Sequence, residues 1–122
     1  MSGEKSRLLG RWGERLAAGF LREKGYAIRD ANWSCRFGEL DLVAEDRGYL
    51  CFVEVKLRKT GAFGSPGEFV DRRKREKLRA AAELYLQKNP TCLQPRFDVV
   101  EIYAPQGTDT PNPRVNHIEN AF

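Results

Sequence analysis

Three carboxylates and one lysine are the residues of this sequence whose types and spacing could do metal or acid–base chemistry: Glu14, Asp41, Glu54 and Lys56. Residues two apart in a strand share a face, so Glu54 and Lys56 project together if their segment is extended. Glu39 and Asp41 likewise share one face of the preceding segment. Carboxylates buried among apolar residues cost roughly several kcal/mol unless they are paired or bind a cation. The pattern therefore predicts carboxylates that converge beside a lysine.

A plainer interpretation of the Glu54-Val55-Lys56 stretch stays open at this point. Antiparallel hairpins often pair glutamate with lysine across a solvent-facing edge, with no catalytic role. Asp46-Arg47-Gly48 predicts a tight turn between two extended segments, so such a hairpin is expected here.

Hydrophobic periodicity predicts the elements that must position these residues. The two predicted helices cover about Gly3 to Lys24 and Glu68 to Lys88, and Asn89-Pro90 ends the second. Strands are predicted at 26–32, 36–46, 49–57 and 97–103, with a last short strand or extended tail after them. This αβββαβ order indicates an α/β fold with a mixed central sheet flanked by helices.

Length and composition limit the class of protein. The chain has 122 residues, 41% hydrophobic and 31% charged, which is typical of one globular domain, here residues 1–122. It contains no apolar run of about 18 residues and no apolar segment after the N-terminus. We therefore expect no membrane partner and a cytoplasmic protein.

Cysteine and histidine usage argues against zinc. Cys35, Cys51 and Cys92 are widely spaced and His117 is the single histidine, so a Cys/His zinc site is not readily assembled. His117 also lies far from any nucleophile motif, which gives little support to a serine or cysteine hydrolase.

The excess positive charge lies in one stretch of the chain. Residues 58–79 carry eight Lys or Arg against three acids, whereas the remaining residues carry 13 basic and 14 acidic side chains. Such a concentration is typical of a surface that binds phosphates of a nucleic acid backbone, although a solvated helix face would also explain it. The glycine-rich loop at 61–67 is expected to follow that backbone. Candidate contact residues are Arg58, Lys59, Arg72, Arg73 and Lys74.

The spacing from Asp41 to Glu54-Val55-Lys56 resembles the signature of the PD-(D/E)-x-K nuclease superfamily, with Leu40 where those enzymes often have proline. Its order is similar to that of archaeal Holliday junction resolvases. More closely, the chain resembles the YraN-like family of small bacterial proteins. That likeness rests on Trp12-Gly13-Glu14, Asn32-Trp33, 38–43, 52–58, 63–66 and Asn120-Ala121-Phe122.

The resemblance implies a restriction-endonuclease-like fold and a metal-dependent endonuclease acting on DNA, with branched and flapped structures as candidate substrates. Asp41, Glu54, Glu14 and the Val55 carbonyl would hold Mg²⁺ or Mn²⁺, which prefer oxygen ligands. Lys56 would contact the phosphate or the attacking water. Glu14 borders the apolar stripe of its helix, so it can lean toward the sheet. Glu39 is either a residue supporting the metal ligands or an exposed charge at the rim.

Two other classes of function stay open. One is a nucleic-acid-binding module with an inactive nuclease site, although all four expected positions are filled here. The other is a protein-interaction domain whose basic helix docks on an acidic partner. A homodimer is also open, with Phe63 and Phe69 as candidate contact residues.

Overall fold

The expected order of helices and strands is confirmed, and the last segment is a fifth strand. The computed structural model describes residues 2–59 and 71–122. Its elements are α1 (Ser2–Glu23), β1 (Ala27–Cys35), β2 (Gly38–Asp46), β3 (Tyr49–Arg58), α2 (Arg72–Lys88), β4 (Gln94–Tyr103), the 3₁₀ turn η2 (Gly107–Asp109) and β5 (Arg114–Ile118).

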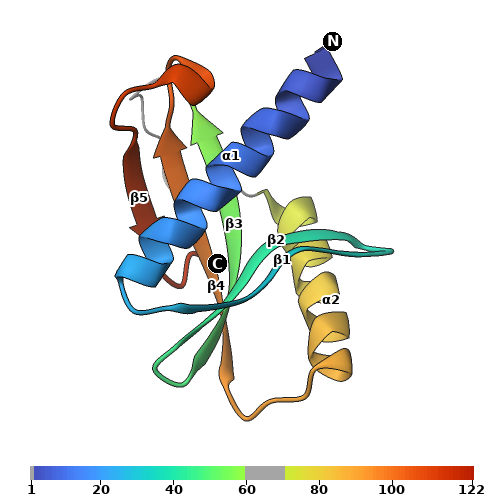
Figure 1. Cartoon of the computed structure of the whole chain (residues 1–122). Helices are drawn as coiled ribbons and strands as arrows, with labels where there is room; N and C mark the ends of the chain where they lie inside the picture. Colours follow the sequence, from blue (N-terminus) through green and yellow to red (C-terminus); the bar gives the residue numbers. More distant parts are fainter. Residues whose placement is uncertain (1, 60–70) are drawn as a thin grey trace.

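The strands form one mixed sheet in the order β1-β2-β3-β4-β5 (Figure 1). β3 and β4 are parallel, whereas the other neighbouring pairs are antiparallel. A parallel pair needs a crossover, and α2 lies in the connection between β3 and β4. The mixed sheet flanked by helices is thus the α/β arrangement that the sequence predicts.

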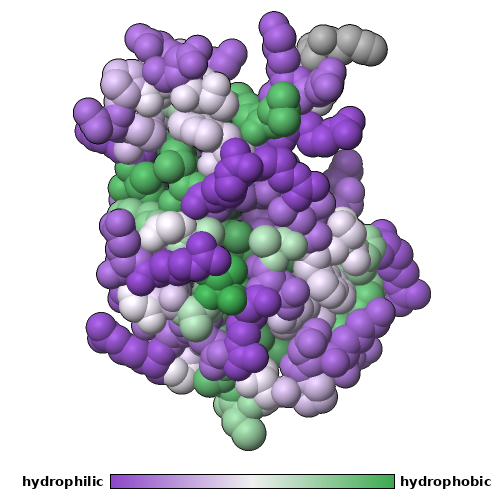
Figure 2. Space-filling view, in the orientation of Figure 1, coloured by the Kyte–Doolittle hydropathy of each residue, from purple (hydrophilic) through white to green (hydrophobic). Residues whose placement is uncertain are grey.

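The two helices cover opposite faces of this sheet. Ala17 and Leu21 of α1 pack against one face together with Val53 of β3. Leu78 and Ala82 of α2 pack in the cluster on the other face. Alternation along the strands assigns each buried side chain to one of these two cores. Figure 2 shows hydrophilic side chains where α1 crosses the front of the sheet and along the side occupied by α2.

The turn between β2 and β3 follows the sequence prediction. Asp46 pairs with Tyr49, and the two residues between them have positive φ angles of 45° at Arg47 and 87° at Gly48. Two left-handed residues match the twist of a two-residue hairpin, and glycine adopts this conformation at little cost. The hairpin sets the register of the two strands that carry the candidate carboxylates.

The predicted limits of three elements need correction, and β4 begins at Gln94 rather than Phe97. β1 continues to Cys35 instead of ending at Asn32, because it pairs with β2 as far as Cys35–Gly38. α2 begins at Arg72 rather than Glu68, since the Asp71 side chain caps it by accepting from the Lys74 amide at 2.8 Å. Residues 60–70, which include the glycine-rich loop, Phe63 and Phe69, lie outside the described residues.

Neither of the two helices described is long and apolar enough to cross a membrane. α1 has 22 residues, but charged side chains occur throughout it.

Candidate functional site

The site begins where β2 separates from β3. The register between these strands starts at Leu42–Val53, and Asp41 precedes it. The Asp41 carboxylate takes over the hydrogen bond that a strand neighbour would make: its Oδ2 accepts from the Val55 amide at 2.9 Å. This hydrogen bond therefore holds Asp41 at the point where β2 and β3 separate. The other carboxylate oxygen of Asp41 does not take part in the bond.

Asn32 lies opposite Asp41 in an unusual backbone conformation. Ala31 pairs with Leu42 and Trp33 with Leu40, which leaves Asn32 between them with a φ of 55°. Asparagine tolerates the left-handed region better than most residues, and such outliers concentrate at functional sites. The Asn32 side chain hydrogen-bonds to the Glu14 carboxylate. Asn32 thus connects β1 to α1 through its hydrogen bond with Glu14.

α1 places Glu14 over this same point. Gly13 allows the close approach, because a Cβ at this position would lie 2.9 Å from Cδ2 of Leu57 on β3. Glu14 Oε1 is buried without a hydrogen-bond partner among the residues that the structure describes, and it lies 4.0 Å from the Arg11 guanidinium. Buried polar atoms normally have partners, so this oxygen is an exception in need of a reason.

Three carboxylates from α1 and β2 converge here. Glu14, Glu39 and Asp41 each offer an oxygen, and these oxygens lie within 4.8 Å of one another. The structure therefore brings together two predicted metal ligands, Glu14 and Asp41. It also places the exposed Glu39 beside them, which agrees both with a residue supporting the metal ligands and with a charge at the rim.

Glu54 lies next to this cluster but has two lysine partners. It is only 6% exposed, and its Oε1 lies 2.8 Å from Lys74 Nζ and 3.7 Å from Lys56 Nζ. Lys56 is on the same face of β3, as residue spacing predicts. The Glu54 charge acts on Asp41 as well, so the two carboxylates belong to one electrostatic unit.

Burial and mutual repulsion change the protonation of this cluster. Burial, together with the charge of Glu54, raises the pKa of Asp41 to about 7, although the bond from the Val55 amide opposes the shift. Burial also raises the pKa of Glu14, against the effect of its hydrogen bond with Asn32. Perturbed carboxylates of this kind are typical of functional sites.

The two lysines respond in opposite directions. Burial and the neighbouring Lys74 lower the pKa of Lys56. The pKa of Lys74 is raised, since the hydrogen bond and charge of Glu54 outweigh its burial. Lys74 is thus the firmly charged partner of Glu54, and Lys56 is the more readily deprotonated amine.

The predicted nucleic-acid contacts separate into two groups. Arg73 and Lys74 line a groove of about 290 Å³ between α2 and the β1–β2 hairpin, with Glu39 on the facing wall. Arg72 lies at the start of α2 and pairs with Glu76 at 3.3 Å. Arg58 ends β3, and Lys59 lines a different hollow with Tyr103. The groove beside α2 is therefore the one that leads to the acidic cluster.

Sequence reasoning missed three residues of this region. Asn32 is in a motif noted above, yet only its positive φ and its bond to Glu14 give it a role. The nucleic-acid contact of Lys74 stays a prediction, and what the sequence did not reveal is its ion pair with Glu54. Glu101 is 2% exposed, and its Oε2 has no partner. A glutamate between Val100 and Ile102 in a strand was the available signal for a buried charge.

Glu101 extends the charged row on this face of the sheet. Glu101 is the register partner of Lys56 on β3. Because side chains alternate along a strand, Glu101 lies on the α2 side of the sheet, whereas Val100 and Ile102 belong to the core on the α1 side. Glu101 Oε1 accepts from Asn116 Nδ2 at 2.9 Å. The buried Glu101 carboxylate therefore lies on the strand next to Lys56, on the face of the sheet that also carries Glu54.

Comparison with known proteins assigns the chain to a family. Residues 13–102 match Uncharacterised protein family UPF0102. The chain is 48% identical over 118 residues to a UPF0102 protein of Syntrophomonas wolfei, covering 96% of this chain and 99% of the relative. A UPF0102 protein of Pseudomonas aeruginosa is 44% identical over 121 residues, covering 98% and 95%. The chain belongs to the UPF0102 family, which confirms the resemblance to YraN-like proteins.

Another relative supports the same assignment. The UPF0102 protein of Caldanaerobacter subterraneus is 43% identical over 115 residues, covering 93% of each chain. The matched region spans Gly13 to Ile102 and includes every carboxylate of the cluster.

Proposed function

We propose that this protein is a divalent-metal-dependent nuclease that hydrolyses phosphodiester bonds in DNA. The observation that carries the proposal is the convergence of Glu14, Glu39 and Asp41 within 4.8 Å, from α1 and β2, beside the lysine-paired Glu54. A protein gains nothing in stability by gathering carboxylates in a half-buried place. A cation that binds there would remove the penalty.

The donor set fits a hard divalent cation. Mg²⁺ and Mn²⁺ prefer carboxylate, carbonyl and water oxygens, which this site offers without a soft ligand. Glu14 Oε1 is buried and lacks a partner, as expected of an oxygen intended for a metal or its water. Asp41, Glu54 and Glu14 would hold the ion, with the Val55 carbonyl as a further expected ligand. When bound, the ion would supply Lewis acidity to a phosphate oxygen and to water.

The residues of the chain account for the remaining requirements of hydrolysis. A water oxygen forms a bond to phosphorus while one phosphorus–oxygen bond of the backbone breaks, and the water's proton passes to solvent or to the leaving oxygen. The Lys56 ammonium, 3.7 Å from Glu54, offers positive charge to the phosphate. Its lowered pKa also makes it a better proton-exchange group at neutral pH than an ordinary lysine.

The basic groove supports a nucleic acid as substrate. Arg73 and Lys77 lie along its α2 wall, and Glu39 of the acidic cluster lies opposite. Arginine and lysine contacts with phosphates position a backbone without reading its sequence. We therefore expect recognition of DNA structure rather than of base sequence, with branched and flapped forms as the substrates to test first.

The experiment is a cleavage assay with Mg²⁺ or Mn²⁺ on duplex, single-stranded, flapped and four-way-junction DNA and on RNA. The Glu54→Gln protein, purified in the same way, is the control for contaminating nucleases. We expect cutting by the wild type alone, and only with metal. Equal cutting by both proteins would contradict the proposal. Binding of DNA without cutting by either would favour the inactive binding module instead.

A further inference from the structure

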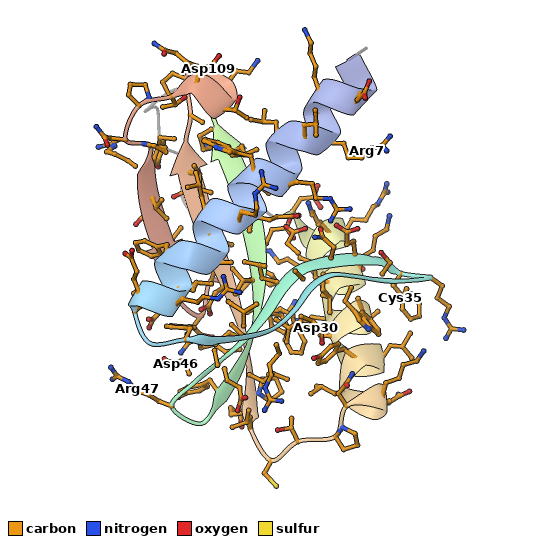
Figure 3. All side chains as sticks on the ribbon, viewed as in Figure 1. Arg7, Asp30, Cys35, Asp46, Arg47 and Asp109 are labelled. Carbon is orange, nitrogen blue, oxygen red and sulfur yellow. The ribbon has the colours of Figure 1, made fainter. Side chains whose placement is uncertain are left out.

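α1 carries a second basic surface that counting charges along the chain does not reveal. Four arginines recur at steps of four, four and seven residues, which places them on one face of the helix: Arg7, Arg11, Arg15 and Arg22. All four are exposed. Figure 3 shows Arg7 projecting from α1 on the side of the β1–β2 hairpin. Three acidic residues on the same helix, Glu4, Glu14 and Glu23, offset part of this charge in the sequence total.

Three of these arginines line a groove that reaches the acidic cluster. Arg11, Arg15 and Arg22 form its α1 wall, and the β1–β2 hairpin forms the other wall. The groove has a volume of about 340 Å³, and Glu14 and Asn32 lie within it. The α1 groove therefore reaches the acidic cluster at Glu14, whereas the α2 groove reaches it at Glu39.

The two grooves lie on opposite faces of the β1–β2 hairpin. Ile28 and Leu42, which line the α1 groove, pack in the core beneath α1. Phe37, which lines the α2 groove, packs in the core beneath α2. Glu14 belongs to the first groove and Glu39 to the second, so the acidic cluster lies between two basic walls.

Two of the three arginines of the α1 groove have no acidic partner among the described residues. The side chains of Arg15 and Arg22 make no ion pair or hydrogen bond within residues 2–59 and 71–122, and the Arg11 guanidinium lies 4.0 Å from the Glu14 carboxylate. Like charges in a row repel one another, so such a row is typical of a surface with an anionic partner. From Arg11 to Arg22 the helix rises by about 16 Å, the axial rise of about five nucleotides in one strand of DNA.

We propose that the α1 groove is a second phosphate-binding surface, which holds the nucleic acid backbone on the far side of the hairpin from the α2 groove. The inference rests on the proposed function in taking DNA as the ligand. It adds that the backbone is held on both sides of the acidic cluster by separate elements. Arg15 and Arg22 are the principal contacts, since Arg11 is already close to a carboxylate.

The test is DNA binding by the double variant Arg15→Gln/Arg22→Gln. Its control is Lys5→Gln/Lys88→Gln, which removes the same charge from exposed positions outside both grooves. Binding of a fluorescent duplex and a four-way junction is measured by anisotropy in EDTA over a range of salt. For the arginine variant we expect an affinity loss of about tenfold or more and a salt slope lower by about 2. The control should stay near the wild type.

The outcomes separate the two proposals. Equal slopes for the two double variants would overturn the α1 surface while leaving the nuclease proposal intact. A reduced slope in a protein that never cuts DNA would support the α1 surface and overturn the nuclease activity. A wild type that binds no DNA would overturn both. Thermal unfolding of each variant checks that the substitutions leave the fold unchanged.

Discussion

Two aspartates on the same sheet have opposite surroundings, one fully buried (Asp98) and one partly buried (Asp41). The Asp98 side chain is 0% exposed. Its carboxylate accepts hydrogen bonds from Arg96 Nε and Nη2, both at 2.9 Å, and from the Asn120 backbone amide at 3.0 Å. His117 Nε2 lies 2.8 Å from its Oδ2. These partners lower its pKa in spite of its burial. Asp41 has one donor, the Val55 amide, and acidic neighbours that help raise its pKa to about 7.

The difference separates a structural charge from a functional one. The partners of Asp98 come from β4, β5 and the C-terminal segment, so the carboxylate joins parts of the fold and needs nothing from outside. Asp41 is gathered with Glu14 and Glu39, and within the described residues the only ion pair to these three carboxylates is the 4.0 Å contact of Glu14 with Arg11. Burying a carboxylate without a cation costs free energy of desolvation. Such a cost in a folded protein indicates a site that binds an added cation.

The largest expected effect is on cleavage. Asp41→Asn should reduce the metal-dependent rate by more than about a thousandfold, because a metal-binding carboxylate is lost from the reacting centre. The folded state should be no less stable, since a repelling charge is removed. Single-turnover cutting of the best DNA substrate measures the rate. A cleavage rate within tenfold of the wild-type rate would show that Asp41 is not part of the metal site.

The reverse pattern is expected for Asp98. Asp98→Ala leaves the Arg96 guanidinium buried without its ion-pair partner and should destabilise the fold by about 3–5 kcal/mol. Urea unfolding at pH 7.5 measures the loss. The matched double variant Arg96→Met/Asp98→Leu should recover much of it, because both charges are then removed. A single variant as stable as the wild type would show that the network is not structural.

The two aspartates should also respond oppositely to pH. Asp41 has a raised pKa in the folded state, so its contribution to stability is present at low pH and lost as the pH rises through about 7. Asp98 has a lowered pKa, so its contribution is present above the normal aspartate pKa and lost in acid.

The measurement is urea unfolding in EDTA at pH 5.5 and 8. The wild type should lose about 2 kcal/mol relative to Asp41→Asn between these values. If the difference between the two proteins did not change with pH, Asp41 would not be the group that titrates.

The smallest effect concerns the cation that already accompanies Glu54. Lys74 Nζ lies 2.8 Å from Glu54 Oε1 and competes with any metal for that oxygen. Lys74→Gln should therefore tighten Mn²⁺ binding severalfold, about 1 kcal/mol. Lys77→Gln, on the same helix, is the control and should leave the affinity unchanged. Weaker binding by Lys74→Gln would show that Lys74 supports the metal site instead of competing with it.

The fold was predictable because its signals are local. Arg47-Gly48 marks the hairpin, and the apolar periodicity of α1 and the strands marks their faces. The β3 pair Glu54 and Lys56 was predictable for the same reason, since alternation fixes a common face. The start of α2 was misplaced because capping by Asp71 depends on a backbone geometry that composition does not reveal.

The rest of the site depends on tertiary placement. Nothing in the spacing from Glu54 to Lys74 indicates a 2.8 Å ion pair, because a crossover connection separates them. Asn32 acquires its role from its positive φ opposite Asp41 and its hydrogen bond with Glu14. The α1 arginines lie in a groove only because the β1–β2 hairpin forms its other wall.

The most direct test of the account is a Mn²⁺ titration followed by electron paramagnetic resonance on the wild type, Asp41→Asn and Asp98→Asn, each confirmed to be folded. If the acidic cluster is a metal site, we expect the wild type and Asp98→Asn to bind Mn²⁺ with the same affinity. We expect Asp41→Asn to bind it at least about a hundredfold more weakly. Equal binding by the wild type and Asp41→Asn would contradict the assignment of the acidic cluster as a metal site.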